Sequence, residues 1–160
     1  MELLQSNESL FDPIRKKWVI SEPEERIRQD LIQKMLKELG YPSSLIAVEK
    51  ELFLLPHLLF ESKERIPKRR ADIIVFGKGI HPHYALFPLL MIECKALPLT
   101  SAFASQVIGY NTVVQAPYLA LANKEQILTG TLDDTLGEYH FESGLPTYEF
   151  LMAGIKIVGS

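Results

Sequence analysis

Apolar residues recur every four positions in a long stretch near the start of the chain, and this spacing predicts a helix. The positions that share one helical face are Ile27, Leu31, Met35 and Leu39. Before them, Ser21 is suited to cap the first turn, and Pro23 fits inside that turn. Gly40 follows the last apolar position and ends the pattern. We therefore expect an amphipathic helix over residues 21–39 that buries one face.

The rest of the chain contains short apolar runs separated by proline, glycine and charged residues, a pattern that is typical of strands. We expect strands over residues 46–55, 70–76, 87–94, 118–122, 127–131 and 138–141. Residues 77–83, rich in glycine, proline and histidine, should form a loop. A second helix over residues 102–114, capped by Thr100 or Ser101, separates two of the strands, which then run parallel with a right-handed crossover. The expected fold class is α/β.

A chain of 160 residues, 47% of them apolar, is long enough to bury one core. We expect residues 1–160 to form a single domain with three parts. Residues 1–19 should form an extended lead-in, residues 20–125 the main core, and residues 126–160 a C-terminal elaboration of the sheet. Within this last part, residues 148–158 fit neither a helix nor a strand clearly.

The composition narrows the class of protein. A net charge of −3 argues against a protein that coats nucleic acid through an overall positive field, so any contact with DNA has to be local. The single cysteine, Cys94, excludes an intramolecular disulfide framework and is typical of a reducing compartment. No apolar run is long enough to span a bilayer, and the N-terminus lacks the basic start of a signal peptide. We therefore expect a cytoplasmic protein with no membrane partner.

Three charged residues stand in apolar runs that are otherwise expected to be buried. Glu93 and Lys95 interrupt the run around Ile92, and Asp72 opens the run of the preceding strand. Side chains alternate along a strand, so Glu93 and Lys95 share one face. If the two strands pair antiparallel, Asp72 can lie opposite Glu93. Carboxylates at interior positions survive by pairing, by hydrogen bonding or by binding a cation, and these residues therefore predict a divalent metal site.

The oxygen ligands expected at this site favour Mg²⁺, or Mn²⁺, over zinc. Asp72 and Glu93 supply two carboxylates, and the backbone carbonyl of Cys94 can supply a third oxygen. Water bound at such a site is the expected nucleophile for phosphodiester hydrolysis. Lys95 then offsets charge on the scissile phosphate, or it helps to orient and deprotonate the attacking water, and the sequence leaves these roles open.

Two further groups of residues belong to the predicted site. Glu24 and Glu25, at the start of the first helix, are both candidates for an additional acid, and either one can face the sheet. A basic run directly precedes Asp72, where a phosphate backbone would have to pass. The basic residues that we expect to contact nucleic acid are Lys68, Arg69 and Arg70.

Several short motifs occur in order along residues 20–125. They are Pro23-Glu24-Glu25-Arg26-Ile27-Arg28-Gln29, Leu39-Gly40-Tyr41-Pro42, Arg70-Ala71-Asp72-Ile73-Ile74-Val75, Ile92-Glu93-Cys94-Lys95-Ala96 and Gln106-Val107-Ile108-Gly109-Tyr110-Asn111. Together they resemble the PD-(D/E)xK nuclease superfamily and, more narrowly, the nuclease domain at the N-terminus of type I restriction enzyme R subunits. Ala71 stands where the superfamily's name has proline.

The resemblance implies a restriction-endonuclease-like core, in which helices flank a central mixed sheet. It implies metal ligands at Asp72 and Glu93, a catalytic Lys95, and an acid on the first helix. It also implies that Gln106 and Tyr110 lie near the DNA or the active centre. The motor domains that follow in R subunits are absent from this sequence, so translocation is not expected of this chain alone.

Three functional hypotheses follow from these residues. The first is a Mg²⁺-dependent DNA endonuclease domain, with double-stranded DNA as its partner and with partner subunits or a homodimer as further candidates. The second is a catalytically inactive nucleic-acid-binding or protein-interaction module on the same scaffold. The third is a structural protein whose acids are paired with Arg69, Arg70 or Lys95.

Overall fold

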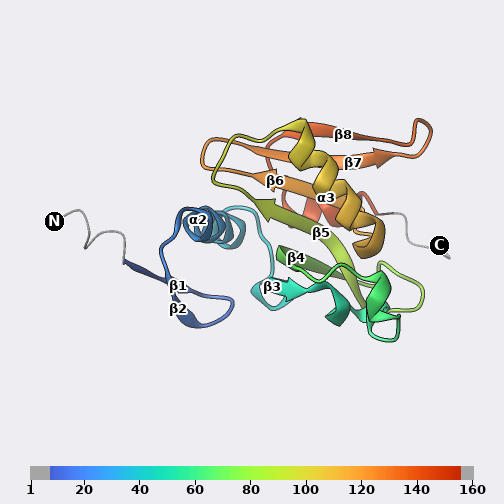
Figure 1. Ribbon diagram of the computed structural model, residues 1–160, viewed down its shortest axis with the longest axis horizontal. Helices are drawn as coiled ribbons and strands as arrows, with labels where there is room; N and C mark the ends of the chain where they lie inside the picture. Colours follow the sequence, from blue (N-terminus) through green and yellow to red (C-terminus); the bar gives the residue numbers. More distant parts are fainter. Residues whose placement is uncertain (1–7, 156–160) are drawn as a thin grey trace.

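The computed structural model describes residues 8–155, which form a six-stranded sheet, three α-helices and an N-terminal hairpin (Figure 1). In spatial order the strands of the sheet are β3 (Ile46–Glu51), β4 (Arg70–Lys78), β5 (Leu86–Cys94), β6 (Tyr118–Ala122), β7 (Ile127–Asp133) and β8 (Glu138–Ser143). Strands β5 and β6 are parallel, and the other neighbours in this sheet are antiparallel. The mixed sheet is therefore confirmed.

The helices flank the sheet, as expected. α2 (Pro23–Lys37) and α4 (Tyr148–Ala153) pack against one face, and α3 (Ser101–Val114) packs against the other (Figure 1). α3 connects β5 to the parallel strand β6, which is the predicted crossover. α4 covers the first part of the ambiguous residues 148–158, and residues 156–158 lie outside the described part of the chain.

The two helix starts are capped differently. Thr100 caps α3 as predicted, because its side-chain oxygen accepts a hydrogen bond from the N–H of Phe103 at 3.1 Å. At the start of α2 the N-cap position is Glu22, and no side chain caps it. The Ser21 hydroxyl instead accepts hydrogen bonds from Arg26 at 2.7 and 3.1 Å. The acidic residues in the first turn of α2 still lie at the positive end of the helix dipole, where negative charge is favourable.

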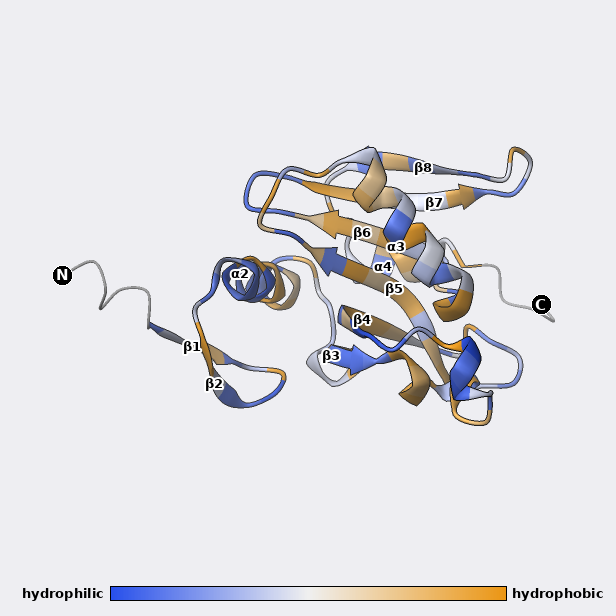
Figure 2. Cartoon of the chain, viewed as in Figure 1, coloured by the Kyte–Doolittle hydropathy of each residue, from blue (hydrophilic) through white to orange (hydrophobic). Residues whose placement is uncertain are grey.

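The core consists of two apolar layers, one on each face of the sheet. Figure 2 shows the hydrophobic colouring concentrated on the central strands and on the side of α2 nearest the sheet. The layer under α2 and α4 contains buried side chains from both helices and from the sheet, including Ile32, Met35, Ile73, Leu90, Ile92 and Leu151. The layer under α3 includes Ile74, Met91, Val107, Val114, Leu119 and Leu121. Each such side chain contributes about 1.5–3 kcal/mol by leaving water.

The N-terminal segment is more ordered than an extended lead-in. Strands β1 (Ser9–Asp12) and β2 (Lys17–Ile20) form an antiparallel hairpin beside α2 (Figure 1). Phe11 pairs across the hairpin with Trp18, and their rings meet edge to face with centroids 5.4 Å apart. Trp18 is 68% exposed. Residues 1–7 of the predicted lead-in lie outside the described residues.

One predicted strand is shorter than expected. The strand expected over residues 46–55 ends at Glu51, and Leu52–Leu54 turns into a 3₁₀ helix. Leu52 and Leu55 are fully buried at this turn, so the apolar run that suggested a longer strand packs into the core as a turn instead.

Another strand is longer than expected. β4 continues through Gly77 to Lys78 and pairs with β5, so the loop predicted over residues 77–83 begins later. Ile80 packs directly over Gly77, and a Cβ at position 77 would lie 2.8 Å from Ile80 Cδ1. Close packing of the following turn therefore favours a glycine at position 77.

Candidate active site

Asp72 and Glu93 lie side by side where β4 begins and β5 ends. The antiparallel register pairs Ile73 with Ile92, and one step further along it brings Asp72 opposite Glu93. The backbone N–H of Asp72 donates to Glu93 Oε2 at 3.4 Å, and the N–H of Cys94 donates to Asp72 Oδ2 at 2.8 Å. The structure thus brings the two carboxylates together at one end of the sheet.

Glu93 is the more deeply buried of the two acids, with only 2% of its surface exposed. Burial raises the pKa of Glu93 well above its ordinary value, and the neighbouring Asp72 raises it further, whereas Arg69 opposes the shift. Burial also raises the pKa of the Cys94 thiol, which packs into the apolar layer under α2. The Cys94 side chain is therefore part of the core rather than a nucleophile.

Two arginines are paired with these carboxylates. Arg28 Nη2 donates to Asp72 Oδ1 at 2.7 Å, and Arg69 Nη2 donates to Glu93 Oε1 at 2.9 Å. Arg28 is 6% exposed, and the buried Nε atoms of both arginines have no hydrogen-bond partner. The two guanidinium groups are therefore hydrogen-bonded to carboxylate oxygens that a metal cation would need as ligands.

Helix α2 turns Glu25 towards these residues and leaves Glu24 exposed. Glu25 accepts a hydrogen bond from Arg28 Nη1 at 3.0 Å, and it is also paired with Arg15. Arg28 consequently bridges Glu25 and Asp72. The sequence left open which acid on α2 faces the sheet, and the structure places Glu25 there.

Arg15 and Glu49 extend the ionic network, and neither was among the predicted site residues. Arg15 lies in the turn between β1 and β2, where it pairs with the fully buried Asp12 and reaches Glu49 at 3.0 Å. Glu49 falls opposite Asp72 in the β3–β4 register without pairing with it, and its φ of +51° means that this position carries some backbone strain. Its carboxylate also lies 3.5 Å from Arg28.

Helix α3 supplies aromatic and amide groups to the same end of the sheet. Lys95 Nζ lies 4.8 Å from the centroid of the Phe103 ring, and the Arg69 guanidinium lies 3.8 Å from that of Tyr110. Gln106 Nε2 donates to the Tyr110 hydroxyl at 3.1 Å. Gln106 and Tyr110 are thereby connected, through Arg69, to the buried carboxylate.

The remaining basic residues of the predicted site lie just before Asp72. Lys68 and Arg70 are exposed, and together with Arg69 they line a cavity of about 530 Å³. Arg70 pairs with Glu51 at 3.2 Å. The structure therefore places all three basic residues around one cavity next to the carboxylates.

The backbone of β5 offers a further oxygen on the side of Asp72. The N–H of Lys95 donates to Ala122 O at 2.9 Å and so points towards β6. Because backbone groups alternate along a strand, the N–H and C=O of Cys94 face the β4 side, where the N–H meets Asp72. Two carboxylates and one carbonyl form a donor set that suits Mg²⁺ or Mn²⁺.

This donor set is small. Within residues 8–155, no three Asp, Glu, His or Cys side chains converge closely enough to hold a metal ion by themselves. Glu25, the third acid nearby, is separated from Asp72 by the Arg28 guanidinium. A cation held here would have to share Asp72 and Glu93 with the arginines or replace them, and solvent would complete its coordination.

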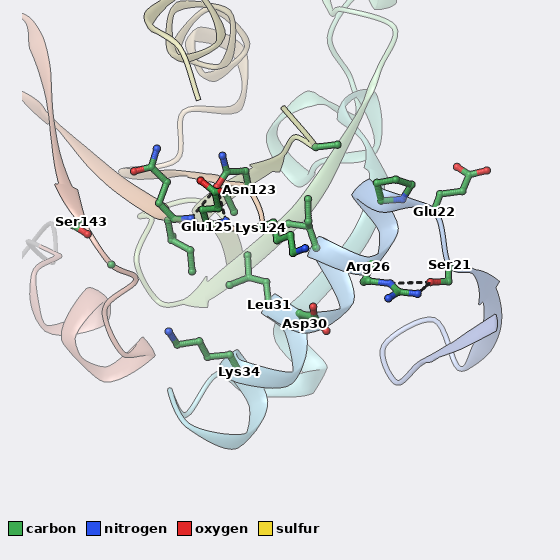
Figure 3. Close-up of a pocket in the computed structure, with 17 residues that line it drawn as sticks. Ser21, Glu22, Arg26, Asp30, Leu31, Lys34, Asn123, Lys124, Glu125 and Ser143 are labelled. Carbon is green, nitrogen blue, oxygen red and sulfur yellow. Dashed lines mark hydrogen bonds between the residues drawn. The ribbon is translucent and has the colours of Figure 1, made fainter. Parts of the chain in front are cut away.

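A second, larger cavity of about 1020 Å³ lies between α2 and the turn that joins β6 to β7 (Figure 3). Its charges balance, because three acids face three bases in its lining: Glu22, Asp30 and Glu125, with Arg26, Lys34 and Lys124. Figure 3 shows the Arg26 side chain turned to Ser21. This cavity therefore offers no net attraction to an anion.

Arg28 was not predicted as a site residue, although the sequence pattern of α2 contains a signal for it. It stands four residues before Ile32 and seven before Met35, so it occupies a position of the buried helical face. A charged residue on such a face indicates a buried ionic partner. The sequence contains no comparable signal for Arg15, which the hairpin brings to the site, or for Glu49, which has a positive φ within β3.

One of three comparisons with known proteins identifies a family. Within residues 8–155, no helix is long and apolar enough to cross a membrane. Neither the search of curated proteins nor the search of solved structures gave a match. The family model for the type I restriction enzyme R protein N terminus matches residues 23–146, which include every strand of the six-stranded sheet. The chain therefore belongs to the family of type I restriction enzyme R protein N-terminal domains.

Proposed function

We propose that this domain hydrolyses phosphodiester bonds in DNA, double-stranded DNA in particular, and that it needs Mg²⁺ or Mn²⁺ to do so. The observation that carries the proposal is the contact between Asp72 and Glu93 at the strand ends, with Lys95 directly after the end of β5. Membership of a restriction-enzyme family supports DNA as the substrate.

In this proposal Asp72, Glu93 and the Cys94 carbonyl hold the cation. When bound, the cation supplies an activated water and neutralises charge on the scissile phosphate. The two carboxylates repel each other at close range, and this repulsion contributes to the raised pKa of Glu93. A bound cation would relieve the repulsion, so the arrangement is better suited to a loaded site than to an empty one.

Lys95 supplies the fixed positive charge of the proposed site. It follows β5 directly and lies on the α3 side of the sheet, where the Phe103 ring limits where its ammonium group can lie. An ammonium in this position stabilises negative charge that develops on the phosphate during attack. Glu25 acts through Arg28 and is a positioning residue, whereas Gln106, Tyr110 and the basic residues before Asp72 contact the DNA.

The arginine pairs give specific support to a second candidate, a non-catalytic nucleic-acid-binding or protein-interaction module. Arg28 and Arg69 already compensate the charges of Asp72 and Glu93, so the carboxylates are satisfied without a metal. In that case the acids fix the strand ends, and the surface around them binds a partner. Metal binding separates the two candidates.

The decisive experiment incubates plasmid DNA with the purified protein and Mg²⁺ or Mn²⁺, beside Lys95→Ala and Lys124→Ala variants. Losing a group that stabilises transition-state charge costs about 10²–10³-fold in rate. We therefore expect Lys95→Ala to abolish detectable cleavage and Lys124→Ala, in the charge-balanced cavity, to retain it. Cleavage that persists unchanged in Lys95→Ala, or intact DNA with every protein and both metals, would refute the nuclease proposal.

A further inference from the structure

The cavity beside Arg69 differs in charge from the larger one on α2. Four of the eight residues that line it are basic, and one is acidic: Lys63, Lys68, Arg69 and Arg70 against Glu51. The acid is already paired with Arg70. An excess of positive charge in a concave site raises the local concentration of anions.

The walls of this cavity are apolar. Phe53 and the buried Ile66 line it together with Pro67, and Lys63 Nζ lies 4.8 Å from the centroid of the Phe53 ring. The volume of about 530 Å³ is within the range of small-ligand sites. A cationic rim over walls that include an aromatic ring matches a nucleotide, which has a charged phosphate and a base whose flat face can stack on such a ring.

Arg69 connects this cavity to the carboxylates. It lines the cavity, its Nη2 donates to Glu93 Oε1 at 2.9 Å, and its buried Nε has no partner. A phosphate group can accept two parallel hydrogen bonds from a guanidinium through two of its oxygens. A phosphate bound in the cavity would therefore compete with Glu93 for Arg69.

We propose that this cavity is a subsite for a phosphate of the nucleic acid strand next to the scissile bond, and that Arg69 couples its occupancy to metal binding. This inference rests on the nucleic-acid substrate proposed above. Arg69 moves towards the phosphate and releases Glu93, which then becomes available to a cation. Substrate and metal thus favour each other's binding, and the coupling is reciprocal.

The subsite is tested by binding, without catalysis. Fluorescence anisotropy of a fluorescein-labelled DNA duplex is measured in EDTA over a salt series, for the unmodified protein and for Lys63→Ala, Lys68→Ala and Lys124→Ala. Each contact with a phosphate adds about one to the slope of log affinity against log salt. We expect the first two variants to lower that slope by about one each, and the matched Lys124→Ala control to leave it unchanged.

The outcomes separate this inference from the nuclease proposal. Equal slopes in all four proteins, or an equal loss in the Lys124→Ala control, would overturn the subsite, even if plasmid cleavage is observed. A lower slope confined to Lys63→Ala and Lys68→Ala supports the subsite, even if no DNA is cleaved.

The coupling is tested in a Lys95→Ala background, in which the DNA stays intact. Duplex affinity is measured at constant ionic strength with and without Mn²⁺, and again after adding Lys63→Ala or Lys124→Ala. We expect Mn²⁺ to raise the affinity about fivefold or more, within the usual range for coupled sites. Lys63→Ala should reduce this factor and Lys124→Ala should preserve it. A factor that is the same in both would overturn the role of Arg69.

Discussion

The middle and the end of the same two strands are built in opposite ways. In the middle of β4 and β5, Ile73, Met91 and Ile92 are fully buried and contribute to the apolar layers. One residue beyond Ile73 and Ile92, Asp72 and Glu93 are held by arginines. Burying apolar surface stabilises a fold, whereas the desolvation of buried ions largely offsets their attraction. The apolar layers therefore stabilise the domain. The ionic end of the two strands, Asp72 and Glu93 with their arginines, contributes little to stability and can serve a function instead.

The largest expected effect is on stability and compares two adjacent residues of β5. Ile92→Ala should lower the free energy of unfolding by about 2–5 kcal/mol, because it removes buried methyl groups and leaves a cavity. Glu93→Gln should change it by less than about 1 kcal/mol, because losing the pair with Arg69 is offset by relief of repulsion from Asp72. Urea denaturation measures both. A Glu93→Gln loss as large as that of Ile92→Ala would mean that the ionic end is structural.

The second effect concerns metal binding at the ionic end. A cation that binds only the folded protein stabilises it by about 2.7 kcal/mol at a hundredfold excess over its Kd. We expect Mn²⁺ to raise the melting temperature of the unmodified protein and to have no such effect on Asp72→Asn. The metal-free melting temperature of Asp72→Asn should stay close to that of the unmodified protein. An equal Mn²⁺ shift in both proteins would place the metal elsewhere.

The third effect distinguishes two neighbouring acids on α2. Glu25 is paired with Arg28, which holds Asp72, whereas Glu24 is exposed. Residues that orient metal ligands commonly contribute 10- to 100-fold to metal affinity or activity. We therefore expect Glu25→Gln to weaken Mn²⁺ binding by about tenfold in calorimetry and Glu24→Gln to leave it nearly unchanged. The reverse order would contradict the placement of Glu25.

The smallest effect comes from a titratable group beside the apolar layer under α3. Burial lowers the pKa of His57 below its usual 6.5, although its hydrogen bond to Val113 O works against this. Since the unfolded chain takes up this proton at higher pH, folded stability should fall as pH drops through 6.5 towards the lowered pKa. Urea denaturation at several pH values should show a smaller fall for His57→Gln. An identical pH dependence in both proteins would contradict this role.

The contact between the two carboxylates could be predicted because it depends on alternation within paired strands. A single antiparallel pairing that buries Ile73 and Ile92 also brings Asp72 to Glu93. α2 and α3 were predictable for a similar reason, since their apolar positions repeat with the helical period, whereas the short α4 lies in a segment whose pattern was ambiguous. Local periodicity thus accounts for most of the framework and for the central pair of acids.

The arginine network could not be predicted in the same way. Arg15 reaches the site because residues 9–20 form a hairpin that packs beside α2, and Glu49 reaches it from a position in β3 that has a positive φ. Neither the hairpin contact nor the positive φ of Glu49 follows from the spacing of apolar residues. The end of the strand predicted over residues 46–55 could not be predicted from apolar spacing either, because Leu52 and Leu55 are buried without belonging to a strand.

The exposed position of Trp18 determines what an optical experiment on this protein reports. It is the single tryptophan of the chain, and it lies on the outer side of the β1–β2 hairpin rather than inside either layer. Its emission should therefore resemble that of an indole in water even in the native protein, and melting of the sheet should shift the spectrum little. Far-ultraviolet circular dichroism will follow unfolding, while quenching of Trp18 by acrylamide or iodide will report on the hairpin alone.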